Sequence, residues 1–402
     1  MRSMDEIVAD YVVDEAKLKP YTLPDPLVCE DGTRIGSAFD WMTRRRPEIM
    51  RIFMREEYGC IPPRPQTMRF ETLTVKDDAL DNTAVRKEIR LHFAMENGRS
   101  HAADMLLYLP KNAPGPVPVF VGLNFKGNQA TTAEPDVAVT GVRMLGQTAQ
   151  PRGCQKGRWC FPELIRRGYA AATACYHDFY PDYQNAVAES VYGMLFDPSE
   201  WAALPDRYTP IGAWAWGLSR MLDCLESEPR IDAARAAVHG HSRLGKTSLW
   251  AGAVDRRFKL VISNDSGCGG GALHKRKFGE NVEALISHDC ADWFVTAFHK
   301  YSGREEDMPF DQHELLALIA PRPLAVGTAT LDIHADPKGE FLSCVHASPV
   351  YRLFGSQGLP AAEMPPPDTP VTGPVSFHYR TGGHDQTPQD WAHYLDIADR
   401  YL

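Results

Sequence analysis

The octapeptide Gly240-His241-Ser242-Arg243-Leu244-Gly245-Lys246-Thr247 stands between a predicted strand at 234–238 and a predicted helix at 244–254. It matches G-x-x-x-x-G-K-[ST], the phosphate-binding loop, whose backbone N–H groups surround a phosphate. It also approaches G-x-S-x-G, the nucleophile elbow, with Leu244 in place of the second glycine. Both motifs occur at strand–turn–helix junctions, so residues elsewhere in the chain have to distinguish between them.

Strand and helix patterns alternate on both sides of the octapeptide. The predicted strands are 68–75, 84–95, 103–109, 117–123, 169–175, 234–238, 258–264, 323–328 and 375–379, and the predicted helices are 39–58, 161–167, 211–228, 244–254, 312–318 and a last one from 388. The run Val117-Pro118-Val119-Phe120-Val121-Gly122-Leu123 is apolar throughout, as in a strand buried on both faces. This order predicts an α/β fold, a three-layer αβα sandwich with a mixed, mostly parallel sheet.

The predicted elements form one domain overall. We expect residues 1–60 to be a helical segment packed on a catalytic domain that spans residues 61–402. Residues 126–160 and 265–310 lack regular patterns, and insertions of this length usually shape a functional site.

Composition and charge exclude several classes of protein. The 402 residues are 44% hydrophobic and 24% charged, which is typical of a globular chain and excludes disorder as the main state. The formal net charge of −9 argues against a nucleic-acid partner, since such binding rests on a basic face. No stretch approaches the roughly 18 apolar residues of a membrane span. The start of the chain lacks the apolar region of a secretory signal, so the sequence by itself indicates a cytoplasmic protein.

The cysteines do not form a disulfide framework. There are nine of them, an odd number with no C-x-x-C pair: Cys29, Cys60, Cys154, Cys160, Cys175, Cys224, Cys268, Cys290 and Cys344. We expect small buried hydrophobic residues, and a single bridge between Cys154 and Cys160 stays open.

The two motifs of the octapeptide make different demands on the remaining sequence. A phosphate-binding loop would find a magnesium-holding acid in Asp265, after the strand at 258–264, but its loop needs small residues where bulky side chains stand. A nucleophile elbow needs an acid and then a histidine further along the chain. Asp265 and Asp332 both follow predicted strands, and His384 follows the last strand in Gly382-Gly383-His384-Asp385. This order favours the elbow, with Ser242 as the nucleophile.

Several segments together resemble one known family. Gly240-His241-Ser242-Arg243-Leu244-Gly245-Lys246 resembles the G-C/H-S-R-x-G-K signature of the glucuronoyl esterases, carbohydrate esterase family 15. The supporting segments, in order, are Leu123-Asn124-Phe125-Lys126-Gly127-Asn128, Asn264-Asp265-Ser266-Gly267-Cys268-Gly269-Gly270, Phe278-Gly279-Glu280, Ala335-Asp336-Pro337-Lys338-Gly339-Glu340-Phe341 and Gly383-His384-Asp385. The resemblance implies the α/β-hydrolase fold, no metal or other cofactor, and hydrolysis of esters between lignin alcohols and the 4-O-methyl-glucuronic acid of xylan.

The same resemblance implies roles for individual residues. Ser242 is expected to be the nucleophile and His384 its base, with Arg243 as a side chain that stabilises the oxyanion. Lys246 and Glu280 are expected to hydrogen-bond sugar hydroxyls. The expected partner is the glucuronoxylan–lignin ester alone, without nucleic acid or membrane, and we expect a monomer. A polymeric substrate implies export, to the periplasm or the medium.

Two positions depart from the family pattern. Asp265 stands where the family often has glutamate, one methylene longer, so Asp332 is a second candidate for the acid that supports His384. His334 stands where the family often has a tryptophan near the sugar, which leaves the substrate preference open.

Other functions stay as alternatives to the glucuronoyl esterase. They are an acetyl xylan or general carboxylesterase of the same fold, a carbohydrate-binding relative with a decayed active site, and a nucleotide-binding protein with a phosphate loop. The basic run His274-Lys275-Arg276-Lys277 is predicted to be a solvated loop, with contact to acidic groups of xylan as its alternative.

Overall fold

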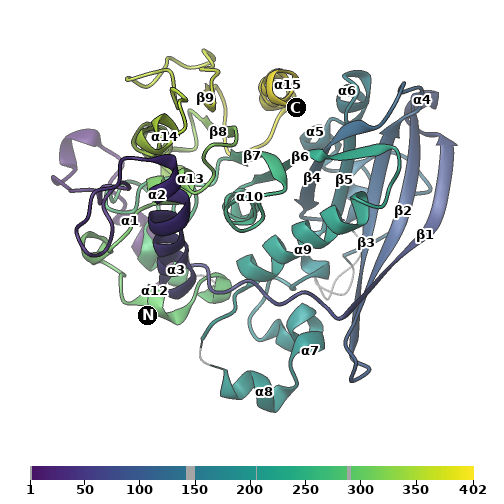
Figure 1. Ribbon diagram of the computed structural model, residues 1–402, viewed down its shortest axis with the longest axis horizontal. Helices are drawn as coiled ribbons and strands as arrows, with labels where there is room; N and C mark the ends of the chain where they lie inside the picture. Colours follow the sequence, from purple (N-terminus) through teal and green to yellow (C-terminus); the bar gives the residue numbers. More distant parts are fainter. Residues whose placement is uncertain (1, 142–149, 205, 288–290) are drawn as a thin grey trace.

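A nine-stranded mixed sheet runs through the middle of the computed structural model, which describes residues 2–141, 150–204, 206–287 and 291–402 (Figure 1). The strands are β1 (Thr67–Asp78), β2 (Ala84–Ala94), β3 (Ser100–Pro110), β4 (Val117–Asn124), β5 (Ala170–Cys175), β6 (Ile231–His241), β7 (Phe258–Asn264), β8 (Leu324–Ala329) and β9 (Val375–Arg380). Their order across the sheet is β1-β2-β3-β5-β4-β6-β7-β8-β9. The pairs from β1 to β5 are antiparallel, and those from β5 through β9 are parallel.

Helices cover both faces of the sheet. They are α1 (Met4–Ala9), α2 (Ala38–Asp40), α3 (Arg46–Glu56), α4 (Ala79–Asn82), α5 (Lys156–Trp159), α6 (Phe161–Arg166), α7 (Val191–Leu195), α8 (Pro198–Ala203), α9 (Pro210–Leu225), α10 (Arg243–Val254), α11 (Val282–Ser287), α12 (Thr296–His299), α13 (Gln312–Ala317), α14 (Pro337–Arg352) and α15 (Pro388–Tyr401). A π-helical turn at Trp41–Arg45 joins α2 to α3. In Figure 1, α6 and α15 lie on one side of the central strands, and α9 and α10 lie on the other.

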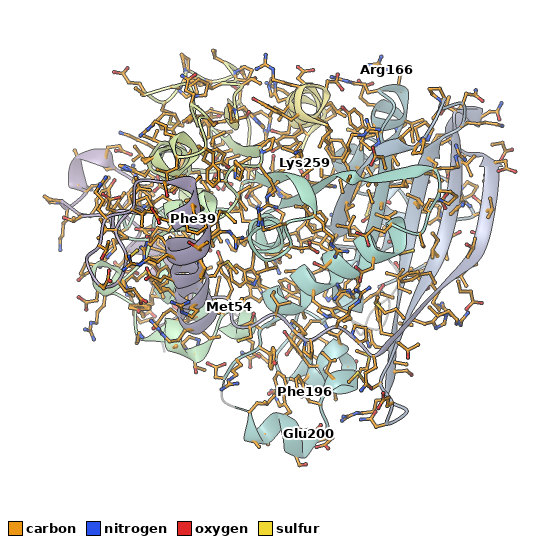
Figure 2. The ribbon with its side chains drawn as sticks, viewed as in Figure 1. Phe39, Met54, Arg166, Phe196, Glu200 and Lys259 are labelled. Atoms are coloured by element: carbon orange, nitrogen blue, oxygen red, sulfur yellow. The ribbon has the colours of Figure 1, made fainter. Side chains whose placement is uncertain are left out.

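Each face of the sheet has its own hydrophobic core, and alternate residues of one strand enter different cores. In β4, Val119 and Val121 pack with α9 and α10, whereas Phe120 between them packs with α6 and α15. This alternation follows from the two-residue period of a strand. Side chains fill the space between the sheet and the helices on either face (Figure 2).

The three-layer fold predicted from the sequence is confirmed, with a strand at each of the nine predicted places. The division into residues 1–60 and 61–402 stays a prediction. Among the described residues, none of the helices combines the length and the apolar composition needed to cross a bilayer.

One alternative that the sequence left open is settled, and one expectation was wrong. Cys154 and Cys160 are both free thiols, and Cys160 Sγ lies 3.2 Å from the Gly157 carbonyl oxygen instead of in a bridge. Of the nine cysteines, Cys290 lies outside the described residues. The basic run is not a solvated loop, because Lys275 and Arg276 are buried and bind protein oxygens, Lys275 the Met308 carbonyl and Arg276 the Asp336 carboxylate.

The fold collects the chemistry-bearing loops at one edge of the sheet. Parallel strands end on the same side, where α/β proteins place their ligand sites. The turn after β6 carries Ser242, and Asp265 directly follows β7. The loop after β8 carries Asp332, and the loop after β9 carries His384.

Candidate active site

The octapeptide forms a sharp strand–turn–helix elbow. Ser242 lies between β6 and α10 with φ 58° and ψ −129°, a conformation that L-residues rarely adopt. Its backbone N–H donates to the Asn264 carbonyl of β7 at 2.9 Å, which fixes the turn against the next strand. A Cβ on Gly240 would lie 1.9 Å from the Leu244 carbonyl oxygen, so this turn closes only around glycine. Leu244 itself is accommodated as a buried helical residue.

His384 lies on the glycine-containing loop between β9 and α15 and is paired with an acid. Its Nδ1 is 2.6 Å from Asp332 Oδ2, from the loop after β8. The His384 side chain is 44% exposed and the Asp332 side chain 12%, so the imidazole faces the solvent-accessible side of the pair. The loop is anchored by α15, which begins with a capping box between Thr387 and Asp390.

Asp265, the other candidate acid, lies deeper than Asp332. It directly follows β7, at φ 44°, and its Oδ2 accepts hydrogen bonds from the Asn264 amide at 3.1 Å and the Asp385 backbone at 3.3 Å. Its buried Oδ1 has no hydrogen-bond partner among the described residues. Burial, reinforced by the charges of Glu340 and Asp332, raises the pKa of Asp265 well above its usual range. Of the two candidate acids, Asp332 is the one that is hydrogen-bonded to His384.

These three side chains also have the grouping of a metal site. The donor atoms of Asp265, Asp332 and His384 all lie within 4.8 Å of one another. Ligands of a tetrahedral zinc ion stand roughly 3.3–3.6 Å apart, because each is about 2.0–2.2 Å from the metal. The 2.6 Å separation of Nδ1 and Oδ2 is shorter than this and fits a direct, charge-assisted hydrogen bond.

A cavity of about 250 Å³ opens beside the elbow. Its lining includes all eight predicted site residues: Ser242, Arg243, Lys246, Asp265, Glu280, Asp332, His334 and His384. Ser266, Gly267, Leu285, Trp293 and Ala335 complete it. The structure thus brings together residues that are up to 142 positions apart in the sequence, from Ser242 to His384.

Arg243, the first residue of α10, is held by partners that the sequence did not indicate. Its Nη1 donates to Asp182 Oδ2 at 2.5 Å, and its guanidinium carbon lies 4.5 Å from the centre of the Trp293 ring. Asp182 also accepts hydrogen bonds from Trp293 Nε1 at 2.7 Å and from the Tyr176 hydroxyl at 2.7 Å. Because these two other donors hold the Asp182 carboxylate in place, the carboxylate holds the Arg243 guanidinium in place in turn. The Arg243 side chain is 31% exposed, and Arg243 lines the same cavity as Ser242.

Lys246, one turn into α10, is buried and lines the cavity. Its Nζ donates to the Ser266 carbonyl at 2.6 Å. The segment that carries this carbonyl is tied in place by Glu340 of α14, whose Oε1 accepts from Ser266 N–H, Ser266 O–H and Gly267 N–H at 2.9 to 3.0 Å. Burial raises the pKa of Glu340 to about 7.

Glu280 and His334 lie side by side in the lining of the cavity. The Glu280 backbone N–H donates to the His334 carbonyl at 2.8 Å. Gly279 has φ 66°, and a Cβ there would lie 2.4 Å from the same carbonyl oxygen, so this close approach requires glycine. Both residues line the cavity, as expected for residues that contact a ligand.

The sheet, the elbow and the histidine–acid pair define a hydrolase of the α/β-hydrolase fold. A sequence profile described as "Glucuronyl esterase, fungi" matches residues 206–355. The carbohydrate esterase MZ0003, from an unknown prokaryotic organism, is 41% identical over 399 residues, which cover 97% of this chain and 91% of that protein. The 4-O-methyl-glucuronoyl methylesterase of Podospora anserina is 28% identical over 76% of this chain and 54% of its own length.

Solved structures agree with these relatives. The glucuronoyl esterase from Solibacter usitatus superposes with a TM-score of 0.91 at 40% identity, covering 97% of this chain and all of that one. A promiscuous CE15 esterase from a marine bacterial metagenome gives 0.88 at 39% identity, over 98% of this chain and all of that one. The chain belongs to carbohydrate esterase family 15, the glucuronoyl esterases, and is a carboxylic ester hydrolase. Membership of this family and the strand–turn–helix geometry at Ser242 favour the elbow motif over the phosphate-binding loop.

Proposed function

We propose that this protein hydrolyses (4-O-methyl-)glucuronoyl esters that link xylan glucuronate to lignin alcohols, through an acyl-enzyme on Ser242. The observation that carries the proposal is the shared cavity. It joins the elbow serine and the His384–Asp332 pair to a lysine and a glutamate that suit sugar hydroxyls. The relatives named as methylesterases and the glucuronoyl esterase structures support the same substrate class.

The first half of the reaction forms the acyl-enzyme. His384 takes the Ser242 proton at Nε2 while Oγ attacks the ester carbonyl, and Asp332 at Nδ1 stabilises the resulting imidazolium. The tetrahedral oxyanion is met by the Arg243 guanidinium and by backbone N–H groups at the start of α10, where the helix dipole also favours negative charge. Collapse expels the alcohol, which leaves with the proton held by His384.

The second half consumes water and restores the enzyme. His384 removes a proton from a water molecule, which attacks the acyl carbonyl and passes through the same oxyanion arrangement. The C–O bond to Ser242 breaks, Oγ recovers its proton from His384, and the free uronic acid leaves. The substrate ester carries no charge at its carboxyl, so Lys246 need not pair with a carboxylate. Its ammonium donates hydrogen bonds to sugar hydroxyls, and the Glu280 carboxylate accepts hydrogen bonds from other sugar hydroxyls.

A comparison of two substrates tests the proposal. Benzyl glucuronate and acetylated xylan are offered side by side, with release of benzyl alcohol and of acetate as the readouts. We expect benzyl glucuronate to have the higher kcat/KM. A clear preference for acetylated xylan assigns the site to an acetyl esterase of the same fold, and binding of glucuronate without turnover of either ester indicates a decayed active site.

A further inference from the structure

The first residues of the chain lie against the wall of the cavity that carries Glu280 and His334. We define the N-terminal arm as residues 2–17, which comprise α1 and a 3₁₀ turn at Glu15–Lys17. Ile7 of α1 is buried, and α1 packs on α11, the helix that follows Glu280. The arm is thus part of the folded wall although it precedes Glu280 by more than 260 positions.

Charged tethers hold the arm at both ends. At its start, Arg2 Nη1 lies 3.3 Å from Glu283 Oε2 of α11. At its end, the Glu15 carboxylate binds Arg276 and also Lys338, whose Nζ is 3.0 Å from Oε2. Arg276 is buried and also pairs with Asp336 at 2.9 Å, so this end of the arm is fastened to the loop that carries His334.

Between these tethers the arm hydrogen-bonds to the sugar side of the site. The Gly279 N–H donates to the Val12 carbonyl at 2.8 Å, and the next residue, Glu280, donates its N–H to the His334 carbonyl at 2.8 Å. Residues 279 and 280 are therefore held between the arm on one side and the His334 loop on the other.

Tyr11 spans this arrangement. Its ring meets the His334 imidazole edge-on, with 5.1 Å between ring centres and 87° between planes. Burial, reinforced by the charge of Glu280, raises the pKa of the Tyr11 hydroxyl. One arm residue thus contacts the imidazole of His334 and lies near the carboxylate of Glu280, and both groups line the cavity.

We infer that the N-terminal arm completes the sugar-binding side of the active site, and that Tyr11 is a positioning residue that sets the preference for uronoyl esters through His334 and Glu280. This inference rests on the proposed function and deepens it. A pyranose ring needs a fixed surface and fixed hydroxyl partners, whereas a small aryl acetate needs only Ser242, His384 and the oxyanion donors. The arm should therefore affect hydrolysis of uronoyl esters but not hydrolysis of a small aryl acetate.

Substitution of Tyr11 tests this with two substrates. In Tyr11→Ala we expect kcat/KM for benzyl glucuronate to fall roughly 3- to 10-fold, mainly through KM, as expected for loss of one aromatic pair. The value for 4-nitrophenyl acetate stays within about twofold. Tyr11→Phe keeps the ring and retains most of the preference. Phe39→Ala, which removes an aromatic ring at an exposed position outside the arm, serves as the matched control and leaves kcat/KM for both substrates unchanged.

A double-mutant cycle separates positioning from a general effect on folding. If Tyr11 acts through His334, the two residues are coupled. Adding Tyr11→Ala to His334→Ala should then lower kcat/KM for benzyl glucuronate by less than about twofold. Equal losses on both substrates in Tyr11→Ala, or fully additive effects with His334→Ala, overturn the inference. An unmodified enzyme that turns over only the aryl acetate contradicts the proposed function itself, and an unchanged KM in Tyr11→Ala of an active enzyme contradicts only the role of the arm.

Discussion

His384 Nδ1 and Asp332 Oδ2 are 2.6 Å apart, and they come from consecutive loops at the carboxyl edge of adjacent strands, β8 and β9. The hydrogen bond leaves Nε2 as the nitrogen available to a substrate-side group, since the two ring nitrogens are distinct. Asp265 lies behind this pair, within 4.8 Å of both partners. The site therefore holds one acid that is hydrogen-bonded to His384 and a second acid close to both of them.

Removal of Asp332 should lower kcat more than removal of Asp265. Asp332→Asn is expected to lower kcat on the order of 10²- to 10³-fold, less than the roughly 10⁴-fold typical of a triad acid. Removal of the Asp332 charge lowers the pKa of the neighbouring Asp265, so that Asp265 can ionise and partly replace the lost charge. Asp265→Asn alone should leave partial activity, with a smaller loss. Steady-state kinetics on benzyl glucuronate measure both.

The double variant completes this test. Asp332→Asn combined with Asp265→Asn should nearly abolish turnover, since neither carboxylate then stabilises the imidazolium. Full activity of the double variant would show that neither acid supports His384.

Arg243 should contribute mainly to kcat. Loss of an oxyanion donor costs about 10²–10³ in rate, so Arg243→Ala is expected to lower kcat by that factor with little change in KM. Asp182→Asn weakens the salt bridge to the Arg243 guanidinium but keeps a hydrogen-bonding amide, and it should lower kcat roughly 10-fold. If Arg243 were only a partner of Asp182, Arg243→Ala would lower stability and leave kcat intact.

Glu340 should make stability depend on pH. Its pKa is raised from 4.5 to about 7 in the folded protein, so the folded state favours the protonated carboxyl. The stability that this group contributes is fully present below about pH 4.5 and is lost as the pH rises toward 7. Glu340→Gln keeps an acceptor for Ser266 and Gly267 without this ionisation. Between pH 5 and pH 8, the free energy of unfolding of Glu340→Gln should rise by up to about 3 kcal/mol relative to that of the unmodified protein.

Urea unfolding at the two pH values measures this difference. The comparison needs both proteins at each pH, because other carboxyl groups titrate equally in both. A difference in unfolding free energy that is the same at pH 5 and pH 8 would mean that Glu340 is already ionised in the folded state.

The elbow should not tolerate a side chain at Gly240. A Cβ there meets backbone atoms of Leu244, which cannot move without unwinding the first turn of α10. Gly240→Ala is therefore expected to lower stability by several kcal/mol and to misplace Ser242. Gly115→Ala, where a Cβ meets open space, is the control and should change Tm by less than about 2 °C. An active Gly240→Ala protein with unchanged Tm would contradict the elbow geometry.

Much of the fold could be predicted because its signals are local. The apolar run at 117–123 indicated a fully buried strand, and β4 is buried along its whole length. The sequence Thr387-Pro388-Gln389-Asp390 indicated a helix start, and α15 begins there with its capping box. In these segments periodicity and capping agree with the tertiary environment, so local chemistry is sufficient.

Eight residues of the cavity lining could be predicted, but Leu285, Trp293 and the side chains that support the lining could not. The order of serine, acids and histidine, together with the family resemblance, located eight lining residues. Asp182, Tyr11 and the buried Arg276 act through partners 60 or more positions away, and no local pattern distinguishes such side chains from solvated ones. The Asp336–Glu340 segment was visible as a motif, yet its role depends on the distant Ser266.

The identity of the nucleophile is tested most directly by covalent labelling of the intact protein. A fluorophosphonate should add once, on the peptide that contains Ser242, and abolish hydrolysis of benzyl glucuronate in proportion to labelling. Ser242→Ala should neither label nor turn over the ester, while its melting temperature stays close to that of the unmodified enzyme. Sustained hydrolysis by Ser242→Ala, or labelling at another residue with loss of activity, would contradict the account.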